Sequence, residues 1–356
     1  MARFSLTDLK SFITNDPTHP FWMGIDVHKK SYAIALLRDD GEYFTWSASA
    51  SPEKLLQQIV DLKIQLGGVC YESGPTGFTL ARTLSKSGIL VIVGAASKVP
   101  RSVTPGSKTD RLDCMKLAHF VSKGLIKPIA IPTEEEEYKR SVLRRRNQVV
   151  DNIRRCKQRI KSFFLYHGFE APESIRLWRS DSFQALDSIS LPKELKFTLD
   201  SHVRELKSLQ EELSTLKKQL YDITHSSQNQ KTMSVLTSVP GVGDVVAATF
   251  LLEIFDPKRF NRGEEIASYL GLAPSVHHSG EKTPRGHLMP VGQTRLRSLL
   301  VEAAWVWQTI DNYANKMYNK LLSRTGVPQK AITAVARKLA IILWRLSIEQ
   351  RVYRSV

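Results

Sequence analysis

Short apolar runs follow one another in a regular order along the first third of the chain. Runs over residues 22–27, 32–37 and 42–47, with the turn sequence Asp39-Asp40-Gly41 between the last two, predict three antiparallel strands. A helical period then begins at Ser51-Pro52 and is expected to end at Gly67-Gly68. The later runs predict a strand over 69–72, a helix over 78–87, a strand over 89–94 and a helix over 110–123.

This order, β-β-β-α-β-α-β-α, is typical of the α/β ribonuclease H-like fold. Asp26 lies in the middle of the first expected strand and Glu72 at the end of the fourth, and these strands are neighbours in that fold. Asp110 and Asp113 are three residues apart at a helix start, so they share one helix face. We therefore expect the four carboxylates to converge.

Converging carboxylates repel one another unless cations neutralise them. Mg²⁺ prefers oxygen ligands and leaves room for water and substrate phosphates, and Mn²⁺ is an alternative. Two such ions can hold the attacking and leaving oxygens of a phosphodiester in line. Taken singly, each acid also has an ordinary explanation, as a strand end, a solvated loop residue or a helix cap. Taken together, they favour a metal site.

The middle of the chain, residues 133–228, predicts long helices with a basic exterior. Two sets of apolar residues step by three and four, from Val149 to Phe163 and from Leu206 to Leu220, and predict a coiled coil within or between chains. A solvated hairpin that only spaces the domains is an equal alternative. Few acids accompany the basic residues of the first helix, and five of these residues are candidate contacts to nucleic acid: Arg144, Arg145, Arg146, Arg154 and Arg155.

The last segment, residues 229–356, predicts mostly helices. The turn Ser238–Gly243 resembles a helix-hairpin-helix, in which Gly241 and Gly243 allow backbone amides to approach a phosphate, although a simple helix connector has the same pattern. A polar loop follows, with Ser279 before a glycine. Its hydroxyl is a poor nucleophile unless its environment activates it. Basic residues that could balance phosphate charge here and in the loop before residue 110 are Lys108, Lys282, Arg285, Arg295 and Arg297.

Charge and composition narrow the class of protein. The 356 residues carry a formal net charge of +16, which indicates a polyanionic partner, most simply nucleic acid. The three cysteines form neither a metal-binding spacing nor an even disulfide set, which predicts a reducing cytoplasmic setting. No stretch is long and apolar enough to predict a membrane span or a signal peptide.

The combination of these motifs is similar to one known family. Asp26, Glu72, Asp110 and Asp113, followed by a coiled coil, a Pro-Gly-Val-Gly segment and Ser279-Gly280-Glu281-Lys282, resemble the DEDD transposases of bacterial insertion sequences, in the family numbered one-ten. The resemblance covers nearly the whole chain. It implies a RuvC-like DEDD metal-binding domain over 1–132, a basic helix and coiled-coil segment over 133–228, and a helical transposase domain with a serine loop over 229–356.

The resemblance also implies a chemistry. Members of that family bind Mg²⁺ at the four acids, and a serine in the C-terminal domain attacks DNA to form a covalent 5′-phosphoserine link, which corresponds here to Ser279. They are implied to act as homo-oligomers, dimers or tetramers, and several use a structured noncoding bridge RNA that pairs with target and donor DNA. This chain departs from many relatives at His278, where a second serine is common, and at Leu288–Val291, which lacks a lysine.

Two other classes of function remain open from the residues. A RuvC-like hydrolytic nuclease would use the acids and water, without Ser279. A non-catalytic nucleic-acid-binding protein would use only the basic helix and the Pro-Gly-Val-Gly turn. A sugar-kinase or actin-like ATPase shares the early strand order but is disfavoured, because no glycine-rich phosphate loop follows in a second related half.

Overall fold

The structure is a computed structural model that describes residues 6–14, 20–96, 99, 109–276, 285–288 and 292–355. The chain divides into two compact units, residues 1–131 and 132–356, which are described separately. Within the described residues, no helix is long and apolar enough to cross a membrane.

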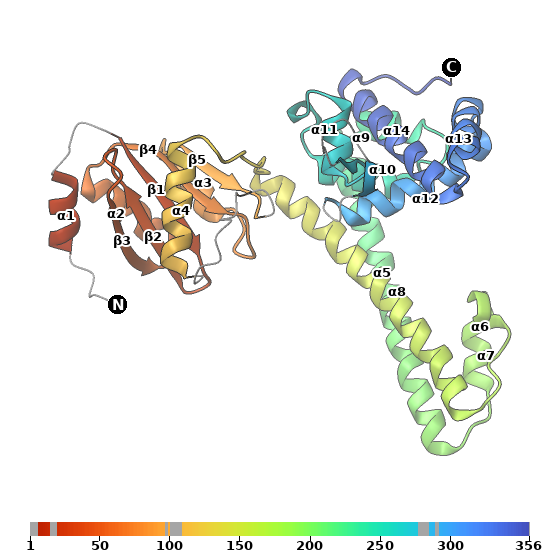
Figure 1. Ribbon diagram of the computed structural model, residues 1–356. Coiled ribbons are helices and arrows are strands. Elements are labelled where there is room, and N and C mark those ends of the chain that lie inside the picture. Colours follow the sequence, from red (N-terminus) through yellow and green to blue (C-terminus); the bar gives the residue numbers. More distant parts are fainter. Residues whose placement is uncertain are drawn as a thin grey trace. The chain divides into compact units, whose positions relative to one another are not determined.

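The first unit is built on a mixed five-stranded sheet in the order β3-β2-β1-β4-β5 (Figure 1). The strands are β1 (Phe21–Val27), β2 (Ser31–Leu37), β3 (Tyr43–Ser49), β4 (Leu66–Glu72) and β5 (Val91–Gly94). Strands β1, β2 and β3 form the expected antiparallel meander, while β4 is parallel to both β1 and β5. This mixed sheet, with helices on both faces, is consistent with the ribonuclease H-like fold.

Helices cover the sheet on both faces. One face packs against α1 (Leu6–Thr14), α2 (Pro52–Leu62) and α3 (Thr79–Lys86) through a core that includes Met23, Ile25 and Tyr71. The other face packs against α4 (Asp110–Ser122), whose Cys114 and Leu117 lie over Ala35 and Cys70, respectively. Because successive strand residues point to opposite faces, the even-numbered residues of β1 face α4.

Helix α1 was not predicted from the sequence, and two further details of the first unit differ from the sequence predictions. Helix α2 ends at Leu62, where Lys63 adopts a left-handed conformation, and Gly67-Gly68 lie inside β4 instead of ending the helix. The glycines are needed for packing, because a Cβ on Gly67 would lie 2.8 Å from the Trp22 ring. Asp26 is the sixth of the seven residues of β1, near its C-terminal end and not in its middle.

The second unit begins with two long helices, α5 (Glu134–His167) and α8 (Lys193–Thr224), which lie side by side and antiparallel, with the short helices α6 (Ser174–Leu177) and α7 (Ser182–Ser188) between them in the chain (Figure 1). Apolar residues of both seams, such as Ile160 and Leu206, share one core. Thus the two seams meet within a single chain in this structure.

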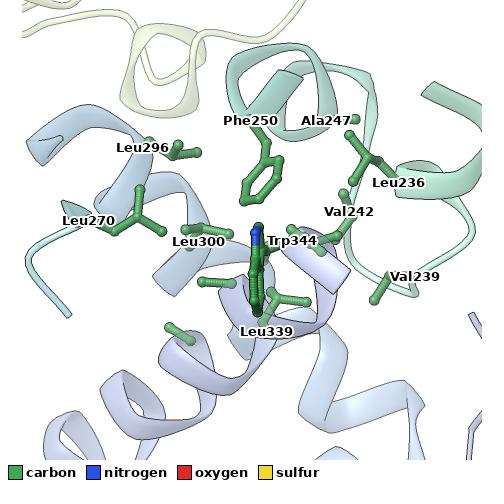
Figure 2. Packing of buried hydrophobic residues seen from close by; sticks show 14 of the residues in the cluster. Leu236, Val239, Val242, Ala247, Phe250, Leu270, Leu296, Leu300, Leu339 and Trp344 are labelled. Atoms are coloured by element: carbon green, nitrogen blue, oxygen red, sulfur yellow. The ribbon is translucent and has the colours of Figure 1, made fainter. Parts of the chain in front are cut away.

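The remaining helices form one apolar core. They are α9 (Gln230–Thr237), α10 (Asp244–Ile254), α11 (Gly263–Tyr269), α12 (Thr294–Ile310), α13 (Asn312–Thr325) and α14 (Pro328–Glu349), with a 3-10 turn at Pro257–Arg259. Phe250, Leu300 and Leu339, from three different helices, point into this core with Trp344 (Figure 2). An unexpected two-stranded sheet, β6 (Pro274–Val276) and β7 (Arg285–Leu288), flanks the polar loop. Its strands are too short for a two-residue period to be recognised.

Candidate functional site

A close approach between β1 and α4 positions the acidic residues of the first unit. A Cβ on Gly24 would lie 2.0 Å from the carbonyl oxygen of Cys114 and 2.4 Å from the amide nitrogen of Ala118, so only glycine allows this approach. Asp26 is two residues further along the strand, about 7 Å away. Asp110 is one turn before Cys114 in the helix, about 6 Å away. Asp26 and Asp110 therefore lie at similar distances from the contact between Gly24 and α4.

Asp26 and Asp110 meet at the imidazole of His28. The Nε2 atom of His28 lies 3.2 Å from Oδ2 of Asp26 and 3.3 Å from Oδ2 of Asp110. One ligand atom from each of the three residues falls within 4.8 Å of the others. The Asp26 side chain is 27% exposed and that of Asp110 is 65% exposed, so the cluster opens to solvent. We call Asp26, His28 and Asp110 the acid–imidazole cluster.

The other two predicted acids lie nearby in the fold. Ile25 of β1 pairs with Tyr71 of β4, so Glu72 is beside Asp26 and on the same sheet face, which is the face covered by α4. Asp113 lies one turn after Asp110, and its charge acts on Asp26. It also contacts Lys116, whose Nζ is 3.6 Å from Oδ1 of Asp113. All four predicted acids thus lie toward one end of the α4-covered face.

The electrostatics of Asp26 reflect this crowding. Burial raises the pKa of the Asp26 carboxyl above its ordinary value, His28 opposes the rise, and the neighbouring charges of Asp110 and Asp113 add to it. A carboxylate whose ionised form is disfavoured in this way is stabilised by a cation bound beside it. Two carboxylates and an imidazole nitrogen within such a short range are a donor set that fits a divalent metal ion.

His28 was not identified from the sequence as a site residue. A signal was present, because His28 is two residues after Asp26 and a strand period of two places both on one sheet face. The backbone amide of His28 donates to the carbonyl oxygen of Ser31, at 3.0 Å, which holds His28 in the turn between β1 and β2.

The basic residues of α5 are in varied environments. Arg144 lies 3.2 Å from Glu253 of α10, and Arg145 lies 3.5 Å from Glu212 of α8. Arg154 contacts Asp151 of its own helix, and Arg155 is exposed. The acids that seemed scarce along this stretch of sequence are therefore supplied partly by other helices.

Arg146 differs from these residues because it is buried. Burial, and then the nearby positive charge of Arg295 at the start of α12, lower the pKa of its guanidinium. Within the described part of the chain, no carboxylate forms an ion pair with Arg146 or Arg295, and the Nε atom of each is buried without a hydrogen-bond partner. Arg297, in the next turn, donates to the carbonyl oxygen of Gly271 at 3.3 Å.

The Pro-Gly-Val-Gly segment connects α9 to α10. Gly241 has a φ of +84°, and a Cβ there would lie 2.7 Å from the carbonyl oxygen of Ala303 in α12, so this glycine serves close helix packing. Gly243 precedes the first residue of α10, and a Cβ added there would meet open space. Lys108, Ser279 and Lys282 lie outside the described residues, and for Arg285 only the backbone, in β7, is described.

Comparisons with known proteins agree with this arrangement. A model of DEDD transposases of the IS110 type matches residues 23–167, and a model described as "Transposase IS116/IS110/IS902 family" matches residues 233–319. A protein of Sinorhizobium fredii named "Putative transposase y4qE" is 30% identical over 93% of this chain and 89% of its own length. The chain belongs to the IS110 family of transposases.

Two other transposases are similar along most of the chain. The transposase for insertion sequence element IS1533 of Leptospira borgpetersenii is 26% identical, over 80% of this chain and 84% of its own. The transposase for insertion sequence element IS1111A of Coxiella burnetii is 22% identical, over 93% of this chain and 91% of its own length. The DEDD match includes all four predicted acids, and the second match includes Gly241, Gly243 and Ser279 of this IS110-family chain.

Proposed function

We propose that this insertion-sequence transposase cuts and rejoins DNA through a covalent link between Ser279 and a 5′-phosphate, assisted by divalent metal at its acids. The observation that carries the proposal is the meeting of Asp26 and Asp110, 84 positions apart in sequence, at one end of the sheet. Membership of a transposase family supports DNA as the substrate.

Asp26, Glu72, Asp110 and Asp113 would hold the metal, which we infer to be Mg²⁺ with Mn²⁺ as a substitute. When bound, the metal neutralises the charge of the scissile phosphate and of the leaving oxygen. The protein's own part is to fix the carboxylates. Their backbone positions are set by the β1–β4 pairing and by the Gly24 contact with α4.

The proposed cleavage and rejoining of DNA need no external energy source. The Oγ atom of Ser279 attacks phosphorus, the bond from phosphorus to the 3′ oxygen breaks, and the serine proton is passed on to give a free 3′ hydroxyl. A 3′ hydroxyl from a different DNA end then attacks the phosphoserine, which returns the hydroxyl of Ser279. Each step exchanges one phosphate ester for another, so no nucleotide cofactor is consumed.

The excess of positive charge is proposed to serve DNA and a structured bridge RNA. Arg155 is exposed, and Arg154 contacts Asp151 of its own helix. Arg146 is buried, with the half-buried Arg295 nearby. Phosphate contacts of this kind are independent of sequence, so recognition of the target would come from RNA–DNA pairing. We further propose that the Gly241–Gly243 turn contacts a DNA backbone through Gly243, the glycine with open space beside it.

The paired helices α5 and α8 are proposed to act as a coiled coil in a dimer or tetramer. Leu165 and Tyr166, near the end of α5, are large apolar residues that remain exposed in the single chain. Assembly would allow the acids of one subunit to act with the serine of another.

The decisive experiment uses end-labelled DNA that carries the element's ends, the flanking RNA and Mg²⁺. We expect label to stay on the protein after denaturation for the wild type and for Ser298→Ala, which alters an exposed serine of α12. Ser279→Ala should lose this label and retain DNA binding. Cleaved DNA without attached protein would instead identify a RuvC-like hydrolytic nuclease. If the wild type and both variants bound DNA without cleaving it, the protein would be a non-catalytic nucleic-acid-binding protein.

A further inference from the structure

The contacts of His28 with the two carboxylates are longer than strong charge-assisted hydrogen bonds. A charge-assisted hydrogen bond from nitrogen to a carboxylate is about 2.7–2.9 Å long. The two contacts of His28 are 3.2 Å and 3.3 Å, and both involve the same Nε2 atom. A single ring nitrogen carries at most one proton and so cannot make two good hydrogen bonds. One ligand atom from each of Asp26, His28 and Asp110 lies within 4.8 Å of the other two, so all three residues could contact one cation.

These separations match those of ligands on one metal ion. Metal–ligand bonds of about 2.1 Å place neighbouring ligands about 3.0 Å apart in an octahedral site and about 3.4 Å apart in a tetrahedral one. The distances from Nε2 to the two carboxylate oxygens fall between these limits. Because the His28 backbone is held by Ser31, the imidazole reaches this point from a fixed turn.

We propose that His28 supplies a nitrogen ligand to a metal ion bound at the acid–imidazole cluster. This ligand shifts the cation preference of the site from Mg²⁺ towards Mn²⁺. Imidazole nitrogen binds first-row transition ions well, whereas Mg²⁺ prefers oxygen ligands and an almost regular octahedron. The inference rests on the proposed function only in requiring that a divalent cation bind at the acids. It assigns a role to a residue outside the four acids of the DEDD set.

The test measures Mn²⁺ binding to the full-length chain, prepared without a histidine tag, alone and with a DNA duplex. Pulsed electron paramagnetic resonance of bound Mn²⁺ detects coupling to a directly coordinated imidazole nitrogen. We expect this nitrogen signal in the wild type and in His119→Ala, which removes an exposed histidine of α4. The signal should be absent in His28→Ala, and titration calorimetry should show Mn²⁺ affinity reduced at least about tenfold.

A second variant separates loss of a ligand from loss of the fold. His28→Asp supplies an oxygen in place of the nitrogen, so we expect it to bind Mg²⁺ at least as well as the wild type and to lack the nitrogen signal. Circular dichroism of each variant checks that the sheet is intact.

The possible results distinguish the two proposals. Mn²⁺ bound to the wild type without a nitrogen signal would overturn the role of His28 and leave the metal site in place. Failure of the wild type to bind either Mn²⁺ or Mg²⁺, with and without DNA, would overturn both. An equal loss of Mn²⁺ and Mg²⁺ affinity in His28→Ala would overturn the change in cation preference.

Discussion

Asp26 occupies a half-buried position in which its charge is costly to the metal-free protein. Burial raises the pKa of its carboxyl, and the nearby charges of Asp110 and Asp113 raise it further against the opposing effect of His28. Strand β1 carries this residue next to the β4 strand that ends in Glu72. Such crowding is typical of sites where function and stability conflict.

Asp26→Asn tests this conflict. The substitution removes one of several converging charges, so we expect the Tm of the metal-free protein to rise. Activity should fall by about three orders of magnitude, since a metal contributes several kcal/mol of charge stabilisation to a phosphoryl transfer. Differential scanning calorimetry without metal and a strand-cleavage assay with Mg²⁺ measure the two effects. A lower Tm together with normal cleavage would show that the carboxylate has a structural role only.

At the scale of single elements, the position of α4 depends on one glycine. Gly24→Ala would place a methyl group against the backbone of α4, at 2.0 Å from the Cys114 carbonyl oxygen. Backbone cannot rotate away as a side chain can, so we expect a loss of about 2 kcal/mol or more in the free energy of unfolding. Urea denaturation measures this loss.

The control for that change is Gly74→Ala. Gly74 lies in the same unit, has no positive φ, and a Cβ there meets no atom within 4 Å. Its substitution should change the free energy of unfolding by less than about 0.5 kcal/mol. Equal effects of the two substitutions would mean that the approach of α4 to β1 is not what requires glycine at position 24.

A second pair of elements is joined by a buried carboxylate. Glu253 of α10 is 9% exposed and accepts hydrogen bonds from Arg140 and Arg144 of α5, and Arg140 is itself 10% exposed. Burial alone would raise the pKa of Glu253, but the two arginines outweigh it and lower the pKa below its ordinary value. The group therefore stabilises the fold above the pKa it has in the unfolded chain.

Its stabilising contribution should be lost as the pH falls through the lowered pKa of the folded state, below about 4.5. Glu253→Gln should cost about 3–5 kcal/mol at neutral pH, because Arg140 is left buried without its partner. Arg144→Gln should cost much less, since its side chain is 55% exposed. Urea denaturation of both variants at pH 7 and pH 4 measures these differences. If Glu253→Gln kept the acid sensitivity of the wild type unchanged, other carboxylates would be responsible.

For the molecule as a whole, the sequence predicted the parts that depend on local pattern. The strand and helix order of the first unit from β1 onward and the shared helix face of Asp110 and Asp113 follow from short-range periodicity. The contact of His28 with Asp110 and the pairing of Arg140 with Glu253 join residues more than 80 positions apart, which periodicity does not describe. The predicted end of α2 was wrong, because Gly67-Gly68 do not end the helix but make room for the Trp22 ring. The assignments of Ser279 and of the nucleic-acid contacts stay predictions.

Buried Arg146 offers a prediction about the whole molecule, because it could link the stability of the protein to its binding of nucleic acid. Arg146 is buried close to Arg295, and burial together with that positive charge lowers the pKa of Arg146. A phosphate would relieve the repulsion, so we expect Arg146→Met to weaken DNA binding and to reduce the slope of log affinity against log salt by about 1. Without DNA, the same variant should be about 1–2 kcal/mol more stable, since methionine keeps the apolar stem and removes a buried charge. Among the described residues, the guanidinium of Arg146 has a hydrogen bond to the side chain of Asn147 but no carboxylate partner.

Arg155→Met is the matched control, because Arg155 lies on the same helix and is exposed. It should leave the Tm unchanged, whatever its effect on binding. Thermal unfolding and fluorescence anisotropy at several salt concentrations give both quantities for each variant. A lower Tm in Arg146→Met, with DNA binding unaltered, would mean that the guanidinium holds the fold together and is not kept for a phosphate. If Arg146 serves to bind an anion, Arg146→Met should raise the stability and weaken DNA binding. If Arg146 is a structural arginine, the substitution should lower the stability.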